Sequence, residues 1–274
     1  MVMREFSLRQ PRRELVRALL FICLALGALC SAGSATALDT SPLFAEALRL
    51  KEEHRDTEAL KLLERLLETT PHDAEVLLHA SHLYFRLGWL YSEKEERRRL
   101  FFRADEAIRK AAELSPDDYA IRLMAVVAKG KIAGYRSSAE QVRIAWELRE
   151  EVNALAELLG SNQVDLLHVQ SWLHFKVGKT SPVERLLARL LFGGLPEDLS
   201  VDKAFALMRR AMDLRPESLV YPYDLGIFYQ RLGQDDQARP WFEKVLAMVP
   251  STPEDAVYQG WARERLAKSQ GREG

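Results

Sequence analysis

Three cations recur at the same place in three similar segments of the chain. Each segment ends in a glycine, and the cation stands two residues before it. The segments are SHLYFRLG (81–88), SWLHFKVG (171–178) and GIFYQRLG (226–233). If they are equivalent helices of stacked repeats, their cations Arg86, Lys176 and Arg231 form a row of positive charge that suits a carboxylate. Lys131 extends this row only if a further unit keeps the same register, which the sequence leaves open.

Aromatic side chains and a histidine accompany this row. A surface that combines cations with aromatic faces suits an acidic peptide or a terminal carboxylate. We therefore predict a ligand-binding set made of His82, Phe85, Arg86, Trp172, Phe175, Lys176 and Arg231. Helix capping is the alternative, because a cation in the last turn before a glycine is favoured by the helix dipole without any ligand. The dipole explains the charges but not the aromatic residues, so both interpretations stay open.

Neither a metal site nor a catalytic motif is indicated. His79 and His82 share one helical face, and His168 and His174 lie in a later segment, but no H-E-x-x-H pattern or carboxylate partner accompanies them. The sequence also has no glycine-rich phosphate loop, no nucleophile elbow and no paired-carboxylate motif. We expect structural histidines, no metal, no cofactor and no enzymatic activity.

The elements that carry these residues repeat along the chain. The same pattern precedes four prolines, with an alanine twelve residues earlier and a larger apolar residue eight residues earlier. Those pairs are Ala59/Leu63 before Pro71, Ala104/Ile108 before Pro116, Ala204/Met208 before Pro216 and Ala238/Phe242 before Pro250. Small residues let two helices cross closely, and proline ends the second helix. The pattern is typical of tetratricopeptide repeats, and it predicts an all-α solenoid of about five stacked hairpins without strands.

Two insertions interrupt the repeats. The first extends from Trp89 to about Arg97, and the second begins with Ser181-Pro182-Val183-Glu184, a capping box that starts a short helix ending at Phe192. That helix is amphipathic. Its apolar side holds Val183, Leu186, Leu187, Leu190 and Leu191, and Arg185 and Arg189 lie opposite. We expect it to pack against its own repeat, with a membrane surface or a partner helix as the alternatives.

The first 37 residues have the composition of a secretory signal. Five arginines precede an uncharged run from Ala18 to Leu29, and small residues ending in Ala35-Thr36-Ala37 fit a cleavage site. An uncleaved membrane anchor is the alternative. Both cysteines, Cys23 and Cys30, lie in this leader, so the mature chain would form no disulfide. We predict an exported, periplasmic or secreted protein with a leader at 1–37, a solenoid at 38–268 and a disordered tail at 269–274.

The insertions also carry a family resemblance. The run SPVERLLARLLFGGLP (181–196), the following SVDKA (200–204) and the closing STPEDA (251–256) resemble the regulator of microtubule dynamics family. The resemblance extends from about Leu83 to Leu266. It implies an α-helical, non-enzymatic repeat protein, and some eukaryotic members associate with microtubules or mitochondria.

The sequence therefore predicts a scaffold that acts after export and binds a protein or peptide, acidic in kind, in the concave groove of its solenoid. A structural brace that uses the insertion helix or the convex face is one alternative. A microtubule-associated regulator is the other, if the leader is not a secretion signal. The net charge of −1 gives no support for nucleic-acid binding. Contact with a membrane would come only through an uncleaved leader.

Overall fold

The structure, a computed structural model, describes residues 41–160 and 162–270. The described residues from 43 onward form one compact unit. The described chain is helical throughout and contains no strand, as predicted. The helices are α2 (Pro42–Glu52), α3 (Asp56–Thr69), α4 (Ala74–Leu90), α5 (Lys94–Leu114), α6 (Tyr119–Ile132), η1 (Ala133–Tyr135), α7 (Ser138–Leu159), α8 (Val164–Gly178), α9 (Pro182–Phe192), α10 (Val201–Leu214), α11 (Val220–Arg231), α12 (Asp235–Ala247) and α13 (Pro253–Gln270).

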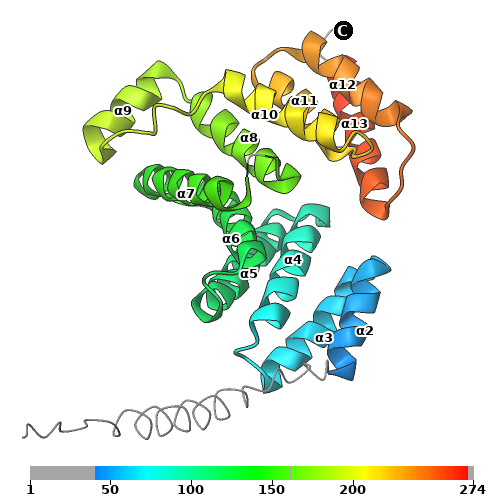
Figure 1. Ribbon diagram of the computed structural model, residues 1–274. Coiled ribbons are helices and arrows are strands. Elements are labelled where there is room, and N and C mark those ends of the chain that lie inside the picture. Colours follow the sequence, from blue (N-terminus) through cyan, green and yellow to red (C-terminus); the bar gives the residue numbers. More distant parts are fainter. Residues whose placement is uncertain (1–40, 161, 271–274) are drawn as a thin grey trace, which may run out of the picture. The chain divides into compact units, whose positions relative to one another are not determined.

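The helices pair as antiparallel hairpins that follow one another along the chain (Figure 1). The pairs are α2/α3, α4/α5, α6/α7, α8/α10 and α11/α12, with α9 inserted in the fourth pair and α13 packed on the last. The alanines of the repeated proline pattern are almost fully buried at the helix crossings: Ala59, Ala104, Ala204 and Ala238. The predicted α-solenoid is confirmed.

A small residue opens each of the three similar segments, and it stands where two helices cross. Ser81 is buried and its Oγ donates to the carbonyl oxygen of Ala104 at 2.8 Å. Ser171 makes the equivalent bond to Ala204 at 2.7 Å. Gly226 replaces serine in the third segment, where an added Cβ would lie 2.6 Å from Cε1 of Phe242. The repeats therefore share one crossing geometry, which places their first helices in equivalent positions.

The glycine that closes each segment has a different role in each repeat. Gly88 is not a helix end, because α4 continues to Leu90, and an added Cβ would lie 2.8 Å from Cε1 of buried Phe101. Gly178 is the last residue of α8, and its added Cβ would lie 2.5 Å from the backbone nitrogen of Val201. Only Gly233 has the positive φ, 74°, of a helix-ending glycine.

Several boundaries differ from the predicted ones. The first insertion is shorter than expected, because α4 extends to Leu90 and α5 begins at Lys94. The helix α7 starts with a capping box formed by Ser137 and Glu140. The capping box at Ser181 and Glu184 is confirmed, with Pro182 at the first position of α9. The last helix, α13, continues to Gln270, and the leader and residues 271–274 of the predicted tail lie outside the described residues.

Candidate protein-binding surface

Four cations from four different helices lie near one another. Lys131 is in α6, Lys176 is in the last turn of α8, Arg231 ends α11 and Arg97 is in α5. The positive charges of the other three all act on Lys131. We call these four residues the inner cation cluster. The structure therefore brings Lys176 and Arg231 of the predicted row together, and Lys131 joins them.

Aromatic rings hold two of these cations. The Nζ of Lys131 lies 3.4 Å from the ring centroid of Trp89 and 4.3 Å from that of Phe101. The guanidinium of Arg231 lies 5.3 Å from the ring of Trp172. A cation over an aromatic face is stabilised by about 0.5–2 kcal/mol without losing its charge. Rings thus position two members of the cluster, and the charge of Asp224 also acts on Arg231.

The surroundings of the cluster disfavour the charged forms of its two lysines. Burial, together with the charges of Lys176, Arg97 and Arg231, lowers the pKa of Lys131 to about 7. The pKa of Lys176 is also lowered, by burial first and then by Arg231. Lys176 and Arg231 are reached by solvent, whereas Lys131 is half-buried. Near neutral pH, Lys131 can therefore gain or lose its proton with a small change in its surroundings.

Arg86, the remaining cation of the predicted row, is not among the charges that act on Lys131, and it pairs with carboxylates instead. Its guanidinium pairs with Asp56 and with Glu254, whose Oε1 lies 3.0 Å from Nη1. Arg86 precedes the last turn of α4, so the capping interpretation does not explain it either. It acts as a structural link between α3, α4 and α13.

The predicted aromatic contacts fall into different environments. Phe175 is fully buried and stacks on Phe228 with ring centroids 4.0 Å apart, so it cannot supply a surface contact. Phe85 is half-buried against Phe101. Trp172 is half-buried, and its Nε1 donates to Oδ2 of Asp224 at 2.7 Å. Of these three, Trp172 lies beside a cation of the cluster.

The histidines have structural partners. Desolvation of the His82 ring, and after it the charge of Lys51, lowers its pKa to about 4, so it is neutral at pH 7. His168 bonds through Nε2 to Asp224 at 2.7 Å, and His174 accepts from the backbone nitrogen of Ser200 at 3.2 Å. No group of three or more potential metal-ligating side chains lies among the residues that the structure describes.

Sequence patterns do not find three residues of this surface. Lys131 stays open in the sequence because the third unit has no closing glycine in the same register. The pattern assigns Trp89 to an insertion, but it lies on α4 and is 41% exposed. Arg97 falls at the end of the same predicted insertion, and it lies in α5. The sequence pattern misplaces Trp89 and Arg97 because α4 continues past Gly88 and α5 already begins at Lys94.

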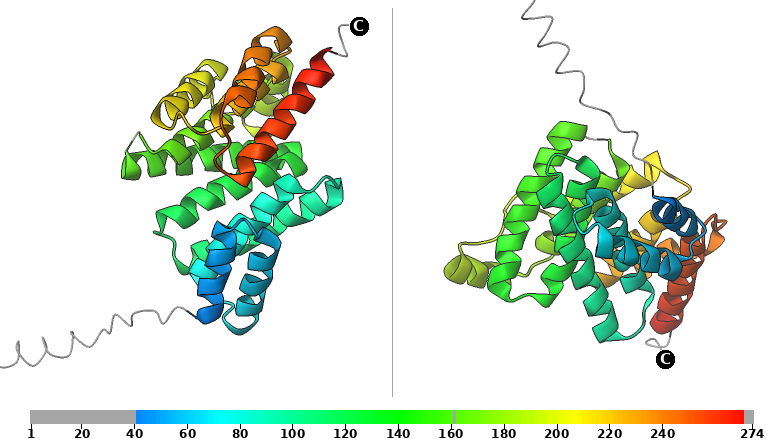
Figure 2. Two further views of the ribbon diagram at one scale, coloured as in Figure 1. Left: turned by 90° about the vertical axis from the view of Figure 1, so that its right-hand side faces the viewer. Right: turned by 90° about the horizontal axis from the view of Figure 1, so that it is seen from below.

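The first and last repeats meet beside this surface. Glu254, at the start of α13, lies 2.9 Å from Nδ1 of His54 and 3.0 Å from Nη1 of Arg86. Trp261, farther along α13, lies against Trp89 with ring centroids 6.3 Å apart. In the left view of Figure 2, the lower end of α13, in red, approaches the first helices, in blue and cyan. Through the contact between Trp261 and Trp89, α13 lies against the same ring that contacts the Nζ of Lys131.

The insertion helix does not pack in the expected way. Its apolar side faces solvent, with Val183 67%, Leu190 71% and Leu191 65% exposed, and Ala188 is its one buried residue. The opposite side faces the protein, where Arg185 donates to the carbonyl oxygen of Val177 at 2.9 Å. The expectation that the leucines brace the repeat is therefore wrong. We call these exposed side chains the α9 apolar face: Val183, Leu186, Leu187, Leu190 and Leu191.

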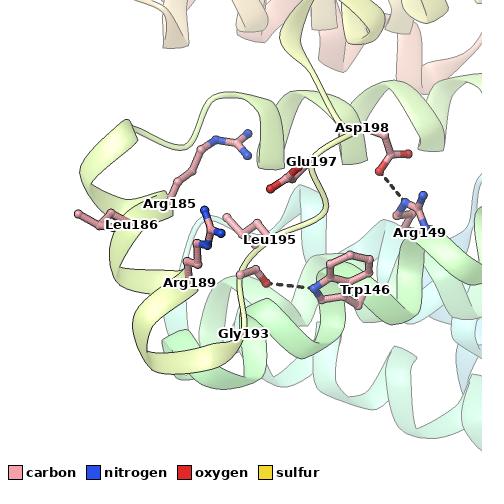
Figure 3. A pocket seen from close by; sticks show the side chains of 10 residues that line it. Trp146, Arg149, Arg185, Leu186, Arg189, Gly193, Leu195, Glu197 and Asp198 are labelled. Carbon is pink, nitrogen blue, oxygen red and sulfur yellow. Dashed lines mark hydrogen bonds and ion pairs between the residues drawn. The ribbon is translucent and has the colours of Figure 1, made fainter.

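A cavity of about 770 Å³ separates α9 from α7 (Figure 3). Its wall is made by the segment that returns from α9 to α10. Trp146 of α7 donates from Nε1 to the carbonyl oxygen of Gly194 at 3.0 Å, and Arg149 pairs with Asp198 at 2.7 Å. These two bonds fasten the returning segment to α7.

Among the described helices, none has the length and apolar character needed to cross a bilayer.

Comparison with known proteins agrees with this architecture. The family described as Regulator of microtubule dynamics protein 1-3 matches residues 43–270. No curated protein matches the sequence. Among solved structures, TTC0263, a thermophilic TPR protein in Thermus thermophilus, is 18% identical with a TM-score of 0.55, over 80% of this chain and 96% of that chain. This similarity shows a shared fold.

Two further solved structures are more distant. MamA from Desulfovibrio magneticus RS-1 is 16% identical with a TM-score of 0.44, over 77% of this chain and 95% of that chain. YrrB, described as a TPR protein with an unusual peptide-binding site, is 14% identical with a TM-score of 0.41, over 81% of this chain and 92% of that chain.

Proposed function

The chain belongs to the regulator of microtubule dynamics family, and from this premise we propose that it is a non-enzymatic scaffold that binds a protein segment on the inner side of its solenoid. The observation that carries the proposal is the inner cation cluster beside solvent-accessible tryptophan. The side chains come from separate repeats, whose fixed crossings hold them in place before a partner arrives. A preorganised surface of this kind binds an extended or helical segment at a low cost in entropy.

A matched pair of tryptophan variants tests the location of binding. Trp89 on the inner side and Trp146 near α9 are similarly exposed, at 41% and 38%. Peptides selected by the full-length protein from a random library of 12-residue sequences serve as probes. We expect Trp89→Ala to weaken their binding at least tenfold, as loss of an interface tryptophan commonly does, and Trp146→Ala to change it less than twofold. Equal peptide binding by wild type and Trp89→Ala would refute the proposal that the inner surface is the binding site.

The α9 apolar face favours a second candidate function. Exposed contiguous apolar side chains are typical of an interaction surface, so the protein would then be a brace that contacts its assembly through α9. The same two variants separate the candidates, because Trp146 fastens the segment that follows α9. Weakened binding by Trp146→Ala together with unchanged binding by Trp89→Ala would favour the brace.

We propose that the protein acts after export. The support is the composition of residues 1–37, with arginines before an uncharged run and a small-residue cleavage pattern. The mature protein, isolated from its native cells, is expected to begin at Leu38 by intact mass measurement and to fractionate outside the cytoplasm. A retained leader in the membrane fraction would instead support an anchored protein. A retained leader in the cytoplasm would favour a microtubule-associated regulator.

A further inference from the structure

The inner cation cluster gathers four cations without a salt-bridge partner in the described part of the chain, and the charge of Asp224 acts on one of them, Arg231. None of its four members makes an ion pair with residues 41–160 or 162–270, the part that the structure describes. Lys129 provides the contrast, since it lies two residues before Lys131 on the same helix and pairs with Glu147 at 3.1 Å. Arg86 likewise has Asp56 and Glu254. Lys129 and Arg86 are therefore paired with carboxylates, whereas these four cations are not.

This arrangement has a free-energy cost in the unliganded protein. Like charges that converge in a partly dehydrated place repel one another, and the pKa of Lys131 is lowered first by burial and then by this repulsion. The Nε of Arg97 is buried and has no hydrogen-bond partner. A guanidinium cannot release its proton near neutral pH, so Arg97 and Arg231 keep their charge. An anion placed among them would relieve both the repulsion and the unsatisfied donor.

The aromatic rings explain how the cations are held but not why they converge. Trp89 and Phe101 lie under Lys131, and Trp172 lies near Arg231. Each ring fixes its cation while leaving the N–H groups that face away from it available for donation. Such positioning lowers the entropy that binding an anion would cost.

The surrounding charge indicates which kind of anion fits. The whole chain has a formal net charge of −1, so the cluster is a local positive site on a nearly neutral protein. A nucleic acid needs a long basic surface for its repeated phosphates. A few carboxylates on a short segment need only a local group of cations, and guanidinium groups match their geometry. The charge distribution favours an acidic protein segment.

We propose that Arg97, Lys131, Lys176 and Arg231 form a subsite that binds the carboxylates of an acidic partner segment. The proposal rests on the proposed function, since it names the chemistry of the segment that the inner surface binds. The carboxylates come from acidic side chains or from the end of a chain, and both sources place the same group among the cations.

Paired peptides test the subsite and separate the two sources. Library-selected peptides are compared with versions that carry Gln and Asn for Glu and Asp, and with versions whose terminal carboxylate is an amide. We expect at least tenfold weaker binding by fluorescence anisotropy when the contributing carboxylate is removed. The substitutions Lys131→Gln and Lys176→Gln are expected to weaken binding of the acidic peptides at least tenfold. The control Lys110→Gln removes an exposed cation of α5 that pairs with Glu106, and it is expected to change binding less than twofold.

A proton measurement distinguishes the subsite from simple packing of cations on rings. Lys131 is partly deprotonated near pH 7, so a bound carboxylate is expected to raise its proton occupancy. The charged groups that face it are Arg97 of α5, Lys176 of α8 and Arg231 of α11, and Trp89 and Phe101 complete its surroundings. Calorimetry at pH 7.5 in two buffers of different ionisation enthalpy should show proton uptake for wild type and none for Lys131→Gln.

Two outcomes would overturn the subsite in different ways. In the first outcome, neutral peptides bind as tightly as acidic ones, the lysine variants bind like wild type, and only Trp89→Ala binds the peptides more weakly. The scaffold function then stands and the subsite is refuted. If no peptide binds, the scaffold function fails, and glutarate is titrated while tryptophan fluorescence is followed. Saturable glutarate binding that Lys176→Gln abolishes would then support the subsite. Its absence would refute the subsite.

Discussion

The inner cation cluster and the α9 apolar face place their side chains in opposite ways. In the cluster, charges that normally lie in water converge against aromatic rings. On α9, leucines that normally lie inside face solvent, and an arginine faces the protein. Each arrangement is unfavourable for the isolated chain. Under the proposals above, an anionic partner would relieve the first and an apolar partner the second, so the two regions differ in the chemistry of the partner that each would bind.

The largest expected effect on stability comes from a substitution at the junction between these two regions. Gly178 ends α8 just after Lys176, and the chain leaves it toward α9. A Cβ there would lie 2.5 Å from the backbone nitrogen of Val201 and 2.6 Å from the carbonyl carbon of Ser200. Since backbone atoms cannot rotate away, Gly178→Ala is expected to lower the free energy of unfolding by about 3 kcal/mol in urea denaturation.

Gly260→Ala is the control for this prediction. Gly260 lies within α13, and a Cβ there would meet nothing within 4 Å. Alanine has the better helix propensity, so the substitution is expected to be neutral or to stabilise by up to about 1 kcal/mol. Equal effects of the two substitutions would mean that α8 and α10 do not cross as closely as the structure shows.

A smaller effect on the free energy of unfolding is expected when the charge of Lys131 is removed. Its pKa is about 7 in the folded protein and near 10.5 ordinarily, so between these values the unfolded chain holds more protons. The free energy of unfolding contributed by this group therefore rises as the pH increases from 7 to 10.5. Lys131→Met is expected to reduce that rise by about 1 kcal/mol, measured by urea denaturation at several pH values. An unchanged pH dependence would mean that Lys131 is solvated like an ordinary lysine.

The smallest effect on stability is expected from the α9 apolar face. Leu190 is 71% exposed, so Leu190→Glu removes few contacts and is expected to change the free energy of unfolding by less than about 0.5 kcal/mol. Binding of a hydrophobic dye should decrease at the same time. Destabilisation by about 2 kcal/mol or more would show that the leucine side packs against the repeat after all.

The repeated architecture was predictable because it depends on local patterns. Alanine at the helix crossings, the capping box at Ser181 and the proline after each hairpin all act within a few residues of their place in the sequence. The same patterns could not predict the side of α9 that faces the protein. An amphipathic helix has a defined apolar face, but its partner is set by which surface lies next to it.

The amino-acid sequence by itself determined the helices, their pairing and the family. It also placed Lys176 and Arg231 at equivalent positions of their repeats. Only the tertiary structure decided that Lys131 and Arg97 join them while Arg86 turns to Asp56 and Glu254. The physical reason is range: helix formation and hairpin packing depend on neighbours in the chain. The grouping of charges depends on the crossing angles accumulated over several repeats, which no single segment encodes.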